Sequence, residues 1–174
     1  MNDEISTLFT EEKIKTKIQK LAQEIRSYYK DKNNVVFIAI LKGSFMFFAD
    51  IAREIGLNVK IDFLQVSSYH NKTQSSLKVL IKKDIDVNIE NSYVIIFEDI
   101  IDTGLTYTKI LEHLQRKNPK EIKICTLFNK PSRRLTKLNI DYTGFEIDNH
   151  FVVGYGIDFN EKHRTLKNVA KINK

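Results

Sequence analysis

Two uninterrupted apolar runs constrain the fold of this chain more than any other feature. Val35–Leu41 holds seven apolar residues in a row, most of them β-branched or aromatic, and residues 94–97 form a second run. A strand that is apolar on both faces has to be covered on both faces, as it is in a parallel sheet between helices. Neither run approaches the roughly 18 residues of a membrane-spanning helix, so we expect no membrane insertion.

Helical patterns lie between the strand-like runs. A helix is predicted after Thr10, where two acids follow a capping residue and apolar side chains recur every three or four positions. Its apolar face is expected to contain Ile14, Ile18, Leu21, Ile25 and Tyr28. A second helix should run through Phe48 and stop at Gly56, a residue typical of helix ends. A third should present Ile110, Leu111 and Leu114.

The order of these elements predicts the fold class. Further strands are expected at residues 59–67, 78–81 and 122–128. Repeated strand, helix and strand units predict an α/β fold in which a central, mainly parallel sheet is flanked by helices. No linker, internal repeat or low-complexity segment divides the chain, so we expect residues 1–174 to form a single domain.

Charge and cysteine content narrow the functional classes. The chain has 28 Lys and Arg against 22 Asp and Glu, a net charge of +6, but these residues are scattered and accompany no nucleic-acid-binding motif. We therefore expect a solvated surface or the steering of a polyanionic ligand. The single cysteine, Cys125, and the lack of a secretory signal favour a cytoplasmic protein. The four histidines lack zinc-ligand spacing.

The stretch from Glu98 to Thr106 carries the clearest chemistry. It places acids and small hydroxyl residues where a buried strand ends, at the sheet edge where open α/β folds bind ligands. Backbone N–H groups and the hydroxyls of Thr103 and Thr106 can cradle a phosphate, and Gly104 permits its close approach. Adjacent acids would repel a bare phosphate, but they can accept hydrogen bonds from sugar hydroxyls or approach Mg²⁺. A phosphorylated sugar would suit both the phosphate cradle and the acid pair. The alternative is an acid cluster that only caps a helix.

Two common nucleotide-binding motifs are absent. No Gly-Lys-Ser/Thr follows a glycine turn, so there is no Walker loop, and Gly-x-Gly-x-x-Gly does not occur. Gly154, Tyr155 and Gly156 lack the third glycine and the following helix, which makes a nucleotide loop there a weak interpretation.

The motif resembles the signature of the phosphoribosyltransferases, which bind 5-phosphoribosyl 1-diphosphate (PRPP). That signature is an apolar strand, two acids, two apolar residues and Asp-Thr-Gly-x-Thr, and here it is complete. Further segments at residues 41–44, 67–69, 129–134 and 151–158 are similar to the hypoxanthine-guanine phosphoribosyltransferases in particular. The resemblance implies the type I phosphoribosyltransferase fold, with a small base-binding hood and a mobile loop.

The resemblance implies a role for each residue on the PRPP side. Glu98 and Asp99 would bind the ribose hydroxyls, and Thr103, Gly104, Leu105 and Thr106 would wrap the 5′-phosphate. Lys42 and Gly43 match a turn that borders the diphosphate and often contains a cis peptide. Arg164 would reach the leaving diphosphate. Mg²⁺ is the implied cofactor, with Glu98, Asp99 and Asp158 as its candidate ligands.

The resemblance also implies the base side and the reaction. Asp102 would act as general base at purine N7, Lys130 would meet the 6-oxo group, Phe151 would stack on the ring, and Val152 would offer backbone contacts beside Asp158. The loop of residues 68–76, with Ser68 and Tyr69, would close as a lid; a passive hairpin is the alternative. The implied activity is Mg²⁺-dependent transfer from PRPP to hypoxanthine or guanine, by a homodimer or homotetramer.

Two positions depart from the family pattern, and a second functional class remains. Leu77 and Asn129 stand where Gly and Asp are frequent in relatives. The competing hypothesis is a regulator that senses PRPP on the same fold without turnover. Such a sensor would need neither Asp102 nor the pair Lys130 and Phe151.

Overall fold

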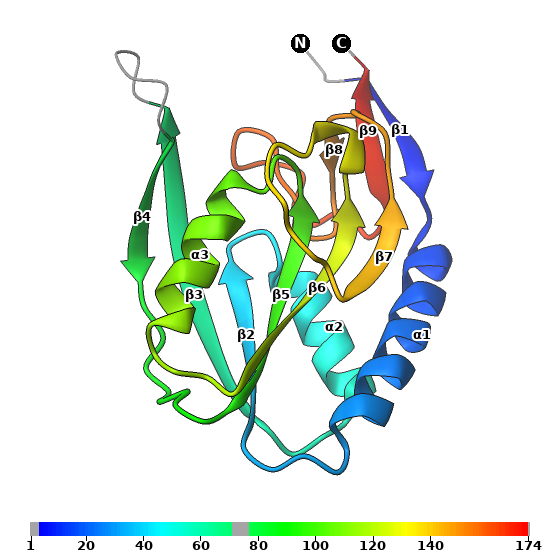
Figure 1. Ribbon diagram of the computed structural model, residues 1–174. Coiled ribbons are helices and arrows are strands. Elements are labelled where there is room, and N and C mark those ends of the chain that lie inside the picture. Colours follow the sequence, from blue (N-terminus) through cyan, green and yellow to red (C-terminus); the bar gives the residue numbers. More distant parts are fainter. Residues whose placement is uncertain (1–3, 71–76, 174) are drawn as a thin grey trace.

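A six-stranded sheet forms the centre of the molecule. The computed structural model describes residues 4–70 and 77–173, and the strand order is β4-β3-β2-β5-β6-β7 (Figure 1). The strands are β2 (Val35–Leu41), β3 (Lys60–His70), β4 (Leu77–Lys83), β5 (Tyr93–Ile101), β6 (Glu121–Asn129) and β7 (Tyr142–Glu146). Every neighbouring pair is parallel except β3 and β4, which are antiparallel. The predicted mainly parallel sheet is confirmed.

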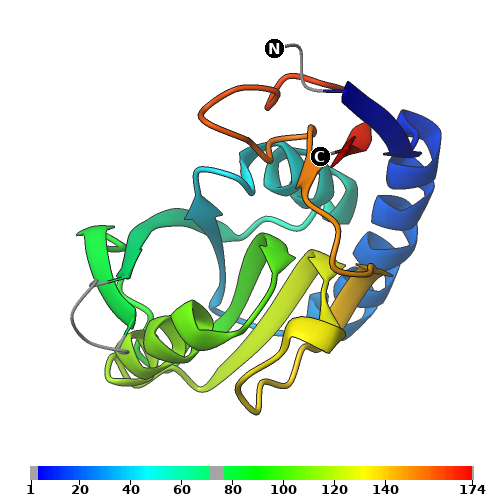
Figure 2. The same ribbon diagram turned by 90° about the horizontal axis from the view of Figure 1, so that it is seen from above.

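Helices cover both faces of the sheet. Helices α1 (Glu11–Tyr29) and α2 (Phe45–Ile55) lie on one face, and α3 (Leu105–Gln115) lies on the other (Figure 2). Successive residues of a strand alternate between the two cores: Phe37 and Ile95 pack on the α1 and α2 side, whereas Ile38 and Ile96 pack on the α3 side. The continuous apolar runs are therefore explained by burial on both faces. No helix in the described ranges is long and apolar enough to cross a membrane.

The predicted helix ends are confirmed, but one core residue is wrong. The Thr10 side chain accepts a hydrogen bond from the Lys13 N–H at 3.4 Å, and Gly56 ends α2 with φ of 63°. Tyr28, predicted on the apolar face of α1, is 38% exposed, whereas Tyr29 is 1% exposed. Tyr29 lies four residues after Ile25 and so completes the buried stripe. The Tyr28 hydroxyl instead donates to the Glu121 carboxylate at 2.7 Å.

A second, smaller sheet is present, and the hydrophobic pattern of the sequence had not predicted its strands, although the family resemblance had implied a hood. Strands β1 (Glu4–Phe9), β9 (Val169–Asn173) and β8 (Val152–Val153) pair in the order β1-β9-β8 and lie beside the carboxyl ends of β6 and β7 (Figure 1). We call this small sheet the hood. Thr7 pairs with Ala170, near the other end of the chain. These strands are too short for a clear alternating pattern, and β7, which was also missed, contains Gly144.

The register of the central strands brings the ends of three chain segments together. Strand β5 continues to Ile101, beyond the predicted end at residue 97, because Glu98 pairs with Thr126 and Ile101 with Asn129 on β6. Leu41 ends β2 on the other side of β5. Lys42, Asp102 and Lys130 therefore follow directly from three neighbouring parallel strands, at the carboxyl edge where ligands bind in open α/β sheets.

Candidate active site

The acids of β5 line a cavity at this edge of the sheet. The cavity has a volume of about 450 Å³. Its polar lining includes Glu98, Asp99, Asp102, Thr103, Gly104, Thr106 and Asp158. Seven residues predicted to belong to the site thus surround one space, although Asp158 comes from a segment far along the chain.

Burial dominates the electrostatics of the acid pair. Asp99 is 8% exposed and Glu98 is partly buried. Loss of hydration raises the pKa of the Asp99 carboxyl, an effect that the nearby Arg164 charge opposes. Loss of hydration also raises the pKa of Glu98 well above its usual value, and the neighbouring Asp99 charge raises it further. Two buried carboxyls in contact favour a cation or hydroxyl donors that would compensate their charge.

The turn after β2 lies directly against these acids. A Cβ atom at position 43 would lie 1.9 Å from Oδ2 of Asp99, so only glycine permits this approach. The Leu41–Lys42 peptide is cis, as the family resemblance implied. The Lys42 ammonium is half-exposed and contacts the Glu161 carboxylate at 3.0 Å.

The loop after Asp102 leads into α3 and has the form of a phosphate cradle. Gly104 precedes the helix with φ of 82° and offers no side chain to cap the first N–H groups. The Leu105 N–H reaches only the Thr103 hydroxyl, at 3.4 Å. The loop is held in place from the other side, because the Leu135 N–H donates to the Thr103 carbonyl at 2.9 Å. Uncapped N–H groups at a helix start are suited to an anion.

Two arginines that we had assigned no role hold Asp102. The Arg133 Nε lies 3.1 Å from Asp102 Oδ1, and the Arg134 Nε donates to the Asp102 carbonyl at 3.0 Å. Arg134 also donates to the Asn129 side chain at 2.6 Å, so asparagine at this position serves as an acceptor. The arginines fall within the residues 129–134 that carry the family resemblance, which was the signal that could have drawn attention to them.

Lys130 lies beside the end of β5, where its N–H donates to the Ile101 carbonyl at 3.0 Å, and its side chain reaches the residue before Phe151. Lys130 is 6% exposed, and its ammonium donates to the His150 carbonyl at 2.7 Å. Burial lowers the pKa of Lys130, and the Asp102 charge partly counteracts this. Phe151 is 47% exposed and contacts Phe159 edge-on, with ring centroids 5.3 Å apart. Phe151 is therefore a half-exposed aromatic residue rather than a core residue.

Val152 connects Phe151 to the hood. It is buried and pairs with Lys171 where β8 meets β9. Phe151, the preceding residue, accepts a hydrogen bond through its carbonyl from the Ile172 N–H at 2.9 Å. The position of the aromatic ring therefore depends on a strand from the end of the chain.

An ionic network joins Lys42 to Arg164. Arg164 contacts Asp158 Oδ1 at 2.7 Å and the Glu161 carboxylate at 3.2 Å, and Glu161 also contacts Lys42. The hydrogen bond from Lys42 is the main cause that lowers the pKa of Glu161. Nothing in the sequence pattern had pointed to Glu161, because it stands in a polar loop with no motif of its own.

The lid and the metal ligands are the two parts of the predicted site that the described part of the structure does not bring together. The structure describes the backbone of Ser68 and Tyr69 at the end of β3, but their side chains and residues 71–76 lie outside the described residues, so the lid stays a prediction. Among the described residues, no three His, Cys, Asp or Glu side chains are grouped closely enough to hold a metal ion. Asp158 thus lines the cavity of Glu98 and Asp99 without joining them in one ligand cluster.

With this geometry known, comparison with known proteins identifies the family. The model of the phosphoribosyl transferase domain matches residues 4–160. The chain belongs to the phosphoribosyltransferase family. A hypoxanthine phosphoribosyltransferase of Haemophilus influenzae is 42% identical over 170 residues, which cover 97% of this chain and 95% of the relative. A hypoxanthine-guanine phosphoribosyltransferase of Aquifex aeolicus is 41% identical over 168 residues, with 97% and 94% covered.

Solved structures of phosphoribosyltransferases show the same fold. A hypoxanthine-guanine phosphoribosyltransferase of Bacillus anthracis superposes with a TM-score of 0.92 at 45% identity. The superposition covers 99% of this chain and 100% of that chain. The hypoxanthine phosphoribosyltransferase of Trypanosoma cruzi gives 0.91 at 36% identity, with 98% and 96% covered. The predicted type I phosphoribosyltransferase fold is confirmed, and the chain is an enzyme of the pentosyltransferase class.

Proposed function

We propose that this phosphoribosyltransferase transfers the 5-phosphoribosyl group of PRPP to hypoxanthine, guanine or both, releasing diphosphate and forming IMP or GMP in purine salvage. One observation carries the proposal: the acid pair Glu98 and Asp99 and the loop from Asp102 to Thr106 line one cavity at the carboxyl edge of the sheet, where Lys130 also follows β6. The names of the relatives from Haemophilus influenzae and Aquifex aeolicus support the purine substrate.

The PRPP side of the site is assigned to β5, the loop after it and the two cationic segments. Glu98 and Asp99 accept hydrogen bonds from the ribose hydroxyls, and Thr103, Gly104, Leu105 and Thr106 bind the 5′-phosphate through N–H and hydroxyl groups. Lys42, Gly43 and Arg164 border the diphosphate. The positive charges of Lys42 and Arg164 stabilise the negative charge that develops on the leaving group.

The acid pair fits Mg²⁺, because this ion keeps few protein ligands and takes its other oxygens from phosphate and water. Glu98 and Asp99 would hold it, and Asp158 faces the same cavity. When bound, the ion would neutralise charge on the diphosphate. Their raised pKa values support this fit, since buried carboxyls without a cation are costly to ionise.

The base side performs the proton transfer and sets selectivity. Asp102 takes the N7 proton as the bond to the anomeric carbon forms, while Arg133 keeps its carboxylate oriented. Lys130 donates to the 6-oxo group, and Phe151 stacks on the purine ring. The ammonium of Lys130 donates to the His150 carbonyl at 2.7 Å, which supports its role as a hydrogen-bond donor.

The lid, the assembly and the location are further parts of the proposal. Residues 68–76, with Ser68 and Tyr69, close over the site and exclude water from the activated sugar. Assembly as a homodimer or homotetramer is what the family resemblance implies, and light scattering of the purified protein would test it. The free, buried thiol of Cys125 supports a reducing, cytoplasmic setting.

A turnover assay with a panel of bases tests the activity. The protein is incubated with PRPP, Mg²⁺ and hypoxanthine, guanine, xanthine or adenine, and product nucleotide and diphosphate are measured. We expect hypoxanthine and guanine to react and adenine to react at least about tenfold less well, because the 6-amino group and Lys130 are both donors. Comparable turnover of adenine and hypoxanthine would contradict the base assignment. Binding of PRPP without turnover of any base would favour the sensor.

A further inference from the structure

The segment of Gly154, Tyr155 and Gly156 packs between the hood and the turn of Lys42 and Gly43, which we call the diphosphate turn. Gly156 has φ of 99°, and a Cβ atom there would lie 2.2 Å from the Gly43 carbonyl oxygen. The segment therefore presses directly on the turn that contains Lys42 and Gly43. What holds it there is the residue between the two glycines.

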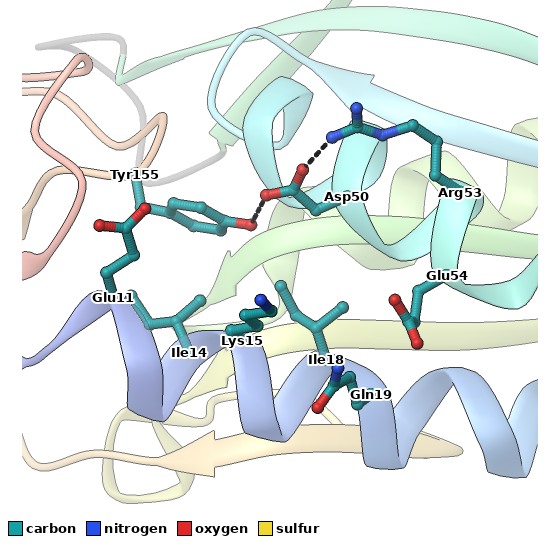
Figure 3. Close-up of a pocket in the computed structure, with 9 residues that line it drawn as sticks. All are labelled: Glu11, Ile14, Lys15, Ile18, Gln19, Asp50, Arg53, Glu54 and Tyr155. Atoms are coloured by element: carbon teal, nitrogen blue, oxygen red, sulfur yellow. Dashed lines mark hydrogen bonds and ion pairs between the residues drawn. The ribbon is translucent and has the colours of Figure 1, made fainter.

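Tyr155 connects this segment to helix α2. Its hydroxyl donates to Asp50 Oδ2 at 2.5 Å, and Asp50 also pairs with Arg53 on the next turn of the helix. Figure 3 shows the Tyr155 ring at one end of a groove between α1 and α2, with its hydroxyl directed at Asp50 and Arg53 beyond it. Burial, and then the bond to Asp50, raise the pKa of Tyr155, so it stays a donor at any ordinary pH.

Helix α2 and the diphosphate turn are one continuous unit. The helix begins at Phe45, two residues after Gly43, and the Ser44 hydroxyl donates to the Ile40 carbonyl at 2.5 Å. Asp50 is thus carried by the same rigid element that carries the turn. A bond from Tyr155 to Asp50 ties the loop to the turn through this helix.

On its other side, Tyr155 is coupled to Arg164. The Tyr155 N–H donates to the Leu166 carbonyl at 2.8 Å, and the Gly156 N–H donates to the Arg164 carbonyl at 2.9 Å. The Arg164 guanidinium returns a hydrogen bond to the Gly156 carbonyl at 2.9 Å. A shift of Tyr155 would therefore move the guanidinium relative to Lys42.

We propose that Tyr155 and Asp50 are positioning residues, whose hydrogen bond sets Arg164 against the turn of Lys42 and Gly43 so that both approach the diphosphate together. This inference rests on the proposed function, since the diphosphate is the ligand of both groups. Neither residue lines the cavity of Glu98 and Asp99; both line the groove between α1 and α2. The alternative is a bond that only stabilises the groove between α1 and α2.

The test separates positioning from stability with four variants of the full chain. Tyr155→Phe removes the hydroxyl and keeps the ring, and Asp50→Ala removes the acceptor. Each should raise the KM for PRPP about 10- to 20-fold, near the lower end of the scale for one hydrogen bond to a charged group, while the KM for hypoxanthine changes less than about twofold. Asp50→Asn keeps an acceptor oxygen and should restore near-normal KM. Arg53→Ala, on the exposed side of the pair, should leave both values unchanged.

Hydrogen exchange gives a readout that does not depend on turnover. In Tyr155→Phe, the amides of Tyr155 and Gly156 should exchange at least about fivefold faster than in the unmodified protein, while the amides of α1 stay unchanged. An unchanged KM for PRPP in Tyr155→Phe, or Asp50→Asn behaving as Asp50→Ala does, overturns the inference. So does an equal rise of both KM values together with a lower Tm. If the unmodified protein turns over neither hypoxanthine nor guanine, the proposed function fails instead.

Discussion

The two halves of the candidate site are built in different ways. The half proposed to bind PRPP comes mainly from one continuous segment, Glu98 to Thr106, which runs from β5, at the centre of the sheet, into the start of α3. The base half is assembled from Lys130 after β6 and from Phe151 and Val152 in the hood. Its aromatic ring is 47% exposed, whereas Asp99 is 8% exposed.

The two halves should therefore differ in rigidity: the acids on β5 should be held firmly, whereas the residues of the hood should be able to move. Buried acids between paired strands have little freedom to move, so the PRPP half is already arranged before a ligand arrives. The base half depends on short strands that pair across the whole chain, for which fewer contacts resist movement. We therefore expect substitutions in the first half to act on PRPP and those in the second to act on the base. Four changes, taken from the largest expected effect to the smallest, test this separation.

Asp102 lies at the junction of the two halves and should show the largest effect. Asp102→Asn keeps an acceptor for Arg133, so the fold and the KM for PRPP should change little. Loss of a positioned general base should lower kcat about 100-fold or more. Steady-state kinetics with hypoxanthine measure this. A variant with kcat near that of the unmodified enzyme would show that the N7 proton leaves by another route.

Gly43→Ala tests the PRPP half without changing any charge. The added Cβ would occupy the space of the Asp99 carboxylate, 1.9 Å from Oδ2, so the acid has to move. We expect the KM for PRPP to rise about tenfold or more, with the KM for hypoxanthine within about twofold. Gly56→Ala is the matched control, because it strains the end of α2 at φ of 63° and should lower Tm without changing either KM. Equal effects of the two variants would mean that only stability had changed.

Lys130→Met tests the base half while keeping an unbranched apolar stem in the buried site. Without a donor for the 6-oxo group, kcat/KM for hypoxanthine and guanine should fall about 10- to 100-fold. The KM for PRPP should stay within about twofold. The ratio of adenine to hypoxanthine turnover should rise, and an unchanged ratio would remove Lys130 from base recognition.

Phe151→Ala should have the smallest effect. The side chain contacts the Phe159 ring edge-on and is half-exposed, so its loss should change Tm little. Stacking contributes modestly, and we expect the KM of every base to rise about three- to tenfold without a change in preference. Inhibition by a base analogue, measured at saturating PRPP, gives the same comparison for binding alone. A shift confined to hypoxanthine would mean that Phe151 selects among bases.

The prediction of the fold from the sequence succeeded where the signal was local. The runs at Val35–Leu41 and residues 94–97 predicted buried parallel strands, and Gly56 marked the end of α2, because each depends on a few neighbouring residues. Tyr28 was misplaced by one position, since a helical pattern allows steps of three or four and only packing decides between them.

The chemistry of the site was visible in the sequence, but its arrangement was not. The acids, hydroxyl residues and glycine from Glu98 to Thr106 lie within nine consecutive positions, so the sequence already indicated a site for a phosphorylated sugar. Three contacts join segments that lie far apart along the chain: the pairing of β1 with β9, the contact of Arg133 with Asp102 and the bond of Tyr155 to Asp50. The burial that raises the pKa of Glu98 likewise depends on the packing of distant segments. Such contacts leave no periodic trace in the sequence, because only the closure of the whole fold brings their partners together.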